Sequence, residues 1–175
     1  KDHIKTKAFM LQHPDIFDKL ILKIEKATIE YLSKQIIAGV DAVKLFDSWA
    51  GSLPGSYLEK YSLIPMKNIA KELRKRFPKI PIIVFPRGVG PMYEKFSEIK
   101  EFNCIAIDSN VDLTWAKNNV QKNNVIQGNL DPAYLISGGK ELVKQTNKIV
   151  EKFSSSGHIF NLGHGITPNA KIENV

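Results

Sequence analysis

Polar side chains that follow apolar stretches are the residues of this chain best suited to chemistry. His164 lies in a Gly-His-Gly segment directly after the apolar run 160–162, and Ser48 follows the apolar run 42–46. The glycines beside His164 permit backbone conformations closed to other residues and leave space around the imidazole. A neutral imidazole donates or accepts a hydrogen bond, and its charged form is favoured near carboxylates. We therefore expect His164 to contact a ligand, and the alternative is a turn histidine that only caps or packs.

Five short apolar runs alternate with helical patterns, and these elements must position the polar residues. Strands are predicted at 42–46, 81–85, 104–108, 125–128 and 159–162. Helices are predicted over 14–38, about 56–76 with a bend or restart at Pro65, 92–100, 112–119 and 138–153. Apolar residues recur at helical spacing in the first helix (Phe17, Leu20, Ile24, Ala27, Tyr31) and line one face of the last (Leu142, Thr146, Ile149, Phe153). Continuous apolar strands separated by helices predict a parallel sheet that is buried on both faces.

Two parallel architectures fit this pattern, an open doubly wound sheet and a (β/α) barrel. A complete eight-stranded barrel needs about 250 residues, whereas this chain has 175. The chain begins at the approach to a helix and ends without a helix after the fifth strand, so we expect a barrel that lacks an amino-terminal portion and the terminal helix. A dinucleotide-binding fold is disfavoured because the glycine-rich loop 88–90 lacks the third glycine of Gly-x-Gly-x-x-Gly and does not open a helix.

The carboxyl ends of parallel strands form one rim, where α/β proteins bind their ligands. The polar and aromatic residues expected at this rim are Phe46, Ser48, Phe85, Arg87, Asp108, Ser109, the segment 127–132 and His164. Hydroxyl, amide, guanidinium and imidazole groups beside aromatic walls suit an anionic ligand that is partly flat and apolar.

Several of these residues also fit purely structural roles. Ser48 suits a turn cap, and Asp131 before a proline is typical of a helix N-cap, the role that we favour for it. Arg87 fits a surface arginine as well as a carboxylate ligand. By composition alone, Phe46 and Phe85 are more often core residues than ligand walls.

Composition describes a globular chain with surplus positive charge. Hydrophobic residues make up 43% of the chain and charged residues 25%, with a formal net charge of +7. Because no arginine-rich run, zinc-finger spacing or aromatic RNA-binding motif occurs, we expect no nucleic-acid partner. No apolar run approaches the roughly 20 residues that span a bilayer, so no membrane partner is expected. The lysines recur at spacings typical of solvated helix faces: Lys19, Lys23, Lys26, Lys67, Lys71, Lys75, Lys140, Lys144 and Lys148.

The single cysteine, Cys104, lies in an apolar run and is expected to be buried. It has no partner for an internal disulfide, and the first residues show no signal peptide, so a cytoplasmic location is expected. The histidines His3, His13 and His158 have no ligand-like spacing with one another or with Cys104, and no metal site is expected.

Three segments together resemble the uroporphyrinogen decarboxylase family. They are residues 46–51 (Phe-Asp-Ser-Trp-Ala-Gly), 127–132 (Gln-Gly-Asn-Leu-Asp-Pro) and 161–166 (Asn-Leu-Gly-His-Gly-Ile), the last followed by Pro168. The resemblance covers nearly the whole chain. It implies an α/β fold of the (β/α)8 TIM-barrel family, with residues 1–175 forming about the last five β/α units and the carboxyl-terminal portion of a single barrel domain.

The resemblance also implies an activity and a set of residues. The family removes the acetate carboxyl groups of uroporphyrinogen to give coproporphyrinogen in haem biosynthesis, without metal or organic cofactor, and forms homodimers. Ser48 and His164 look like its substrate-contacting residues, and Phe46 looks like part of the wall against the macrocycle, with Phe85 a weaker candidate. The family's amino-terminal arginines, its pyrrole-binding aspartate and a substrate-contacting tyrosine have no counterpart here. We therefore expect no catalytic residue in this chain, and no activity from the 175 residues alone.

Two other functions stay open. One is a zinc-dependent cobalamin or thiol methyltransferase of the same fold family, although Cys104 is the only thiol available as a ligand. The other is a non-catalytic tetrapyrrole-binding fragment, because half a barrel exposes unpaired strand edges that favour self-association.

Overall fold

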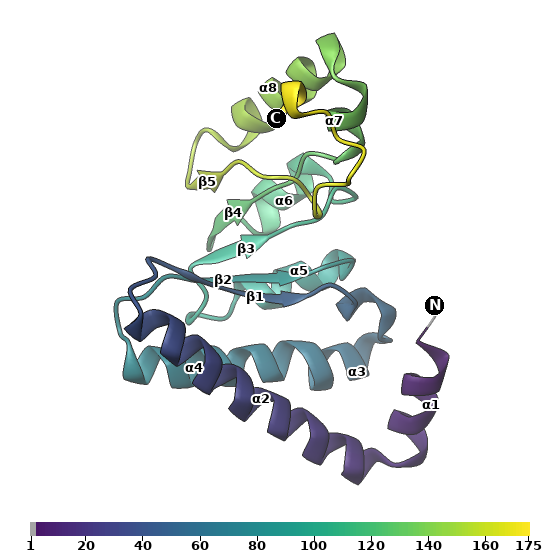
Figure 1. The fold of residues 1–175 in the computed structure, drawn as a ribbon, viewed down its shortest axis with the longest axis vertical. Helices are drawn as coiled ribbons and strands as arrows, with labels where there is room; N and C mark the ends of the chain where they lie inside the picture. The colour runs from purple at the N-terminus through teal and green to yellow at the C-terminus, as the bar shows by residue number, and fades with distance from the viewer. Residues whose placement is uncertain (1–2) are drawn as a thin grey trace.

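The computed structural model describes residues 3–175 and contains one parallel sheet of five strands (Figure 1). The strands are β1 (Val43–Asp47), β2 (Ile82–Pro86), β3 (Cys104–Ala106), β4 (Val125–Gln127) and β5 (His158–Ile159). They lie in the sheet in the order in which they occur along the chain, β1-β2-β3-β4-β5. A doubly wound sheet reverses its strand order at a switch point, whereas a barrel does not. The topology is therefore that of a barrel segment.

Side chains alternate between the two faces of this sheet. Leu45 pairs with Val84, which pairs with Ile105, which in turn pairs with Ile126. This row is buried in one apolar cluster with the helix residues Leu73, Ile149 and Phe153, so it forms the outer face of the sheet. Because successive strand residues point to opposite faces, the neighbouring row of Phe46, Phe85, Ala106 and Gln127 lies on the inner face, which would line the interior of a barrel.

Helices precede β1 and connect the successive strands on the outer face. They are α1 (Ile4–Gln12), α2 (Pro14–Ile37), α3 (Gly55–Leu58), α4 (Ile64–Arg76), α5 (Tyr93–Ser97), α6 (Leu113–Asn119), α7 (Ala133–Ser137) and α8 (Gly139–Phe153). In Figure 1, α2, α3 and α4 lie together against β1 and β2, whereas α6, α7 and α8 lie at the other end of the sheet. Short 3-10 turns occur at Ala50–Ser52, Gly90–Met92 and Ile172–Asn174.

The predicted interruption near Pro65 is present as a π-helical turn, Glu59–Leu63, between α3 and α4. Proline has no backbone N–H and cannot donate in the interior of an α-helix. A wider turn directly before it lets the helical path continue, and Pro65 itself stands in the first turn of α4.

The helix predicted at 14–38 is α2, but the predicted apolar stripe is largely exposed. Phe17 is buried, whereas Leu20, Ile24 and Tyr31 are 44%, 50% and 64% exposed. The helix instead buries Leu32 and other residues on the side that packs against α4. Periodicity located the helix correctly and its buried face incorrectly, because both sides of α2 carry apolar residues.

Three strands are shorter than predicted, β4 by one residue, and two helices were not predicted. The third strand ends at Ala106 rather than residue 108, although the N–H of Ile107 still donates to the carbonyl of Gln127 at 2.9 Å. The fifth comprises only His158–Ile159, and its predicted continuation contributes one isolated bridge, Leu130 to Leu162. The short helices α1 and α7 replace stretches expected to be a helix approach and a turn.

The surface agrees with the charge pattern in the sequence. Of the nine lysines assigned to solvated helix faces, eight are exposed, and Lys67 is half-buried. Within residues 3–175, no helix combines the length and the apolar character that crossing a bilayer requires.

A buried carboxyl group between α2 and α4 generates a pH-dependent prediction. Glu25 is 8% exposed, and Asn68 Nδ2 donates to it at 3.3 Å. Burial raises the pKa of Glu25 because apolar surroundings disfavour the charged form. A pKa raised by folding stabilises the fold below the ordinary pKa of glutamate, and this contribution is lost as the pH rises through the folded pKa. Glu25→Gln should therefore unfold at higher urea concentration than wild type at pH 8, and at about the same concentration at pH 4.

The exposed Glu151→Gln in α8 is the matched control and should leave the urea midpoint unchanged at both pH values. A Glu25→Gln variant less stable than wild type at pH 8 would show that the fold stabilises the charged carboxylate instead.

Candidate functional site at the strand ends

The polar rim is organised around the buried carboxylate of Asp108, which follows β3 and is 3% exposed. One carboxylate oxygen accepts hydrogen bonds from the N–H of Gly88 and the hydroxyl of Tyr93, both at 2.8 Å, and the other accepts from the N–H of Asn110 at 3.0 Å. Burial and the negative charge of Asp108 raise the pKa of Tyr93, so its hydroxyl stays protonated and available as a donor. Three donors thus satisfy a carboxylate that would otherwise be costly to bury.

Close backbone approach joins the loops after β1 and β2. The N–H of Arg87 donates to the carbonyl of Asp47, and the N–H of Gly51 donates to the carbonyl of Arg87, both at 3.0 Å. A Cβ on Gly51 would overlap the carbonyl group of Gly88. Only glycine therefore fits at position 51, and the turn that carries Ser48 is held against the loop that carries Arg87.

The loops after β4 and β5 are joined in the same way. Asn129 is buried, and its side-chain amide donates to the carbonyls of Asp108 at 2.9 Å and Val111 at 3.0 Å. The N–H of Leu130 donates to Asn161, and the N–H of Gly163 donates back to Leu130. The segments 127–132 and 161–166 thus position each other, and Asn129 ties both to the carbonyl of the central Asp108.

The two glycines beside His164 differ from each other and from their predicted role. Neither has a positive φ. A Cβ on Gly163 would overlap the backbone nitrogen and side-chain oxygen of Ser109, whereas a Cβ on Gly165 would meet nothing within 4 Å. Gly163 therefore lets the loop approach the end of β3, and unusual backbone conformation is not the reason for either glycine.

The structure brings together Ser48 and Arg87, but His164 lies outside their cavity. A polar cavity of about 220 Å³ is lined by Ser48 and Arg87 together with Gly88, Asp108 and Asn110. Arg87 forms no ion pair with any residue in 3–175, so its guanidinium is free to bind an anion there. His164 is exposed on the loop after β5, at the other end of the rim.

Phe46 lies on the inner face of the sheet and is 64% exposed. Its ring meets Phe85 edge-on, with centroids 6.1 Å apart, so the two aromatic residues form one apolar wall just below the rim. Asp131 was predicted to be an N-cap but stands one residue before the N-cap of α7, Pro132, and its carboxylate accepts a hydrogen bond from the N–H of Ala133 at 2.8 Å at the start of that helix.

Sequence reasoning overlooked Lys44, which projects from β1 across the inner face. Its ammonium group donates to Gln127 Oε1 on β4 and lies 4.7 Å from the ring centroid of Phe46 and 5.2 Å from that of Phe85. Burial lowers the pKa of Lys44 because few polar groups surround the charge. The signal was present in the sequence, since a lysine inside an otherwise apolar parallel strand is unusual.

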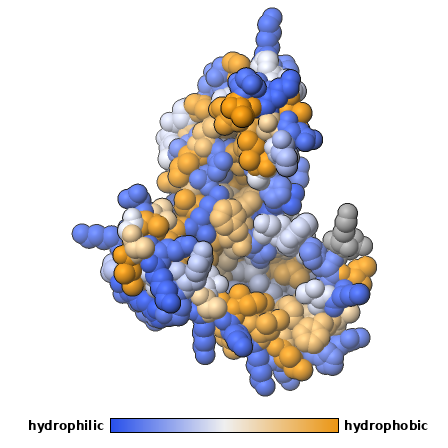
Figure 2. All heavy atoms as spheres, in the orientation of Figure 1, coloured by the Kyte–Doolittle hydropathy of each residue, from blue (hydrophilic) through white to orange (hydrophobic). Residues whose placement is uncertain are grey.

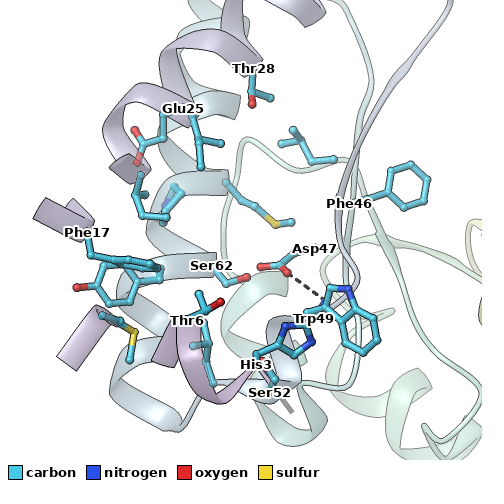
Figure 3. Close-up of a pocket in the computed structure, with 18 of the residues that line it drawn as sticks. His3, Thr6, Phe17, Glu25, Thr28, Phe46, Asp47, Trp49, Ser52 and Ser62 are labelled. Atoms are coloured by element: carbon cyan, nitrogen blue, oxygen red, sulfur yellow. Dashed lines mark hydrogen bonds between the residues drawn. The ribbon is translucent and has the colours of Figure 1, made fainter. Parts of the chain in front are cut away.

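A larger cavity of about 380 Å³ lies on the other side of β1, between that strand and α1, α2 and α4. Figure 3 shows Phe17, Glu25 and Thr28 of α2 along it, while the ring of Phe46 points away on the far side of the strand. Most of its lining is apolar, as is much of the nearby surface over α1 and α2 in Figure 2. The polar cavity at the rim is the better match for an anionic ligand.

Cys104 opens β3 and is buried, as predicted. Burial raises the pKa of its thiol to about 12, so the thiolate needed as a metal ligand is disfavoured. Within residues 3–175, no three His, Cys, Asp or Glu side chains lie together in a way that could hold a metal ion.

Comparison with known proteins agrees with the resemblance seen in the motifs. The profile of a family described as uroporphyrinogen decarboxylase (URO-D) matches residues 1–175. A protein named uroporphyrinogen decarboxylase from Cereibacter sphaeroides is 54% identical over 160 residues, which cover 91% of this chain and 47% of that protein. Proteins of the same name from Paracoccus denitrificans and Rhodobacter capsulatus are each 49% identical to this chain. The matches cover 99% and 100% of this chain, respectively, and 51% of each relative. The chain spans about half the length of the curated relatives it matches.

The contrast between Gly163 and Gly165 yields a prediction about the rim. Gly163→Ala should destabilise the protein by about 1–3 kcal/mol, because the added methyl group overlaps Ser109 and forces the loop outward. Gly165→Ala, two residues away, should change stability by less than about 0.5 kcal/mol because its Cβ enters open space. Chemical unfolding of both variants measures the difference, and equal stability would contradict the packing described for residue 163.

Proposed function

This chain belongs to the uroporphyrinogen decarboxylase family, and on that premise we propose that it is the carboxyl-terminal portion of an enzyme that decarboxylates uroporphyrinogen. Residues 1–175 would form about the last five β/α units of a single (β/α)8 barrel domain. We propose further that the complete protein is a cytoplasmic homodimer that takes part in porphyrin biosynthesis.

The observation that carries this proposal is the common location of the three family-like segments. Residues 46–51, 127–132 and 161–166 run from the carboxyl ends of β1, β4 and β5 of one parallel sheet. That edge is where barrel enzymes bind their substrates. Here it combines the guanidinium of Arg87, which forms no ion pair within residues 3–175, with hydroxyl and amide donors and the Phe46–Phe85 wall. A macrocycle with apolar rings and peripheral carboxylates complements such a surface.

The chemistry requires a proton, an electron sink and a protected site. Protonation of a pyrrole carbon turns the ring into an electron sink, and the bond between the acetate methylene and its carboxylate then breaks to release carbon dioxide. A second proton adds to the methylene carbon to give the methyl group, and loss of the first proton restores the pyrrole. The protein contributes by holding the carboxylates and by placing fixed dipoles around the charge that develops on the ring.

We assign substrate-binding roles to Ser48, His164 and Phe46. Ser48 lies in the polar cavity beside Arg87, where its hydroxyl can donate to a carboxylate. Phe46 offers a ring face to the pyrroles from the inner face of the sheet. His164, exposed on the loop after β5, would approach the substrate from the opposite end of the rim. The groups that protonate the ring would come from the amino-terminal half, so we propose that residues 1–175 alone do not turn over substrate.

Anaerobic incubation of the full-length protein with uroporphyrinogen, followed by separation of the products by carboxylate number, tests this function. Stepwise appearance of the hepta- to tetracarboxylate products is expected. A folded protein that yields no such products would overturn the proposal. Bound zinc together with methyl transfer would then support the methyltransferase alternative, and tetrapyrrole binding without turnover would support a binding role.

Replacement of the proposed contact residues tests their assignment. Ser48→Ala and His164→Ala should each lower kcat/KM for uroporphyrinogen by about 10- to 100-fold, because each removes a hydrogen bond to a charged group. Thermal unfolding should change little, since neither side chain forms a hydrogen bond within residues 3–175. Ser155→Ala, in the exposed turn after α8, is the matched control. Wild-type turnover by both Ser48→Ala and His164→Ala would contradict the assignment.

A further inference from the structure

The inner face of the sheet holds a positive charge that the assigned substrate contacts do not include. Lys44 on β1 donates to Gln127 on β4, with β2 and β3 between them in the sheet, so the two side chains meet over the inner face beneath the rim. The nine lysines on helix faces, in contrast, point outward into solvent or are half-buried at the surface. Lys44 is therefore placed differently from the lysines that only keep the surface charged.

The partners of this ammonium group are neutral. Gln127 accepts one hydrogen bond through its amide oxygen, and the rings of Phe46 and Phe85 face the charge at 4.7 and 5.2 Å. No carboxylate within residues 3–175 forms an ion pair with Lys44. An ammonium group has three N–H donors, so two remain for another partner.

These surroundings hold the charge in place without neutralising it. Aromatic faces attract a cation weakly and exclude water from it. An anion that arrives in such surroundings interacts more strongly with the ammonium group than it would with a lysine in bulk water, because less solvent screens the pair. A bound anion would also offset the lowering of the Lys44 pKa by burial.

We propose that Lys44 is a further substrate-binding residue, whose ammonium group binds a carboxylate of the tetrapyrrole on the inner face of the sheet, beneath the rim, while Phe46 and Phe85 contact the adjacent pyrrole. This inference rests on the proposed function. The flat apolar part of the ligand meets the aromatic wall, and the carboxylate at its edge meets the cation held against that same wall. Gln127 acts as a positioning residue, since it fixes the ammonium group through one hydrogen bond.

The test uses the full-length protein and the oxidised octacarboxylate uroporphyrin as a binding probe, followed by fluorescence, so that it does not require turnover. Lys44→Gln should weaken uroporphyrin binding by about 10- to 100-fold, because a charge-assisted hydrogen bond is lost. Lys44→Arg should retain most of the affinity, and Gln127→Met should have a smaller effect of about 3-fold. The exposed Lys71→Gln removes the same charge from α4 and should bind like wild type.

A second readout separates substrate binding from a structural role. A lysine that only pairs with another part of the protein would lower the melting temperature when replaced by Gln, whereas the proposed role leaves the melting temperature of Lys44→Gln unchanged or raised. Should Lys44→Gln fail to fold, Lys44→Met and Lys44→Arg would be compared with Gln127→Met in the same assays. Unchanged uroporphyrin binding in Lys44→Gln, or a melting temperature that Lys44→Gln lowers and Lys44→Arg restores, would overturn the inference.

Kinetics identify which carboxylate is bound and separate this inference from the proposed function. If Lys44 binds an acetate carboxylate, Lys44→Gln raises KM for uroporphyrinogen but leaves inhibition by the product coproporphyrinogen, which has lost those groups, unchanged. If it binds a propionate, both change. A wild-type protein that binds uroporphyrin through Lys44 without decarboxylating uroporphyrinogen would refute the proposed function alone. An active wild type matched by Lys44→Gln in binding and KM would refute this inference alone.

Discussion

The rim of this sheet depends on one buried anion and the donors that surround it. Asp108 lies where β3 ends, in the middle of the five strands, and removing its carboxylate from water would be costly without partners. The loop after β2 provides the N–H of Gly88, α5 provides the Tyr93 hydroxyl, and the chain after β3 provides the N–H of Asn110. Each donor comes from a segment that must adopt one conformation to reach the carboxylate. Because the buried carboxylate of Asp108 needs these hydrogen-bond donors, it fixes the shape of the loops that carry them.

The remaining loops join this centre through backbone contacts. Gly51 lets the turn after β1 touch Gly88, and Gly163 lets the loop after β5 touch Ser109, so the two outer loops approach the middle from opposite sides. The side-chain amide of Asn129, which follows β4, donates to the main-chain carbonyl of Asp108 and so joins the loop after β4 to the same centre. Most residues of the three family-like segments therefore hold the rim together. Only a few of their side chains are available to contact a ligand.

The fold was predictable from the sequence to the extent that it follows from hydrophobic pattern and proline chemistry. All five strands, the long α2 and the interruption before Pro65 were predicted because apolar runs and a missing N–H act locally. The buried side of α2 was not predictable, because the exposed residues Leu20, Ile24 and Tyr31 are as apolar as the residues that pack against α4. The roles of Asp108 and Gly163 were not predictable either. They depend on which loops lie next to each other in space, and a single sequence does not contain that information.

The order of the strands also bears on how the chain folds. Among the described residues, strands pair only with their neighbours in sequence, and each crossover contains at least one helix. No strand must wait for a distant segment before it gains a partner, so the entropy lost in closing each loop stays modest. Assembly can proceed by successive addition of one β/α unit to the edge of those already formed. Asp108, at the end of the central strand, would gain two of its donors, Gly88 and Tyr93, from the β/α unit that precedes β3, and the third from Asn110, two residues further along the chain.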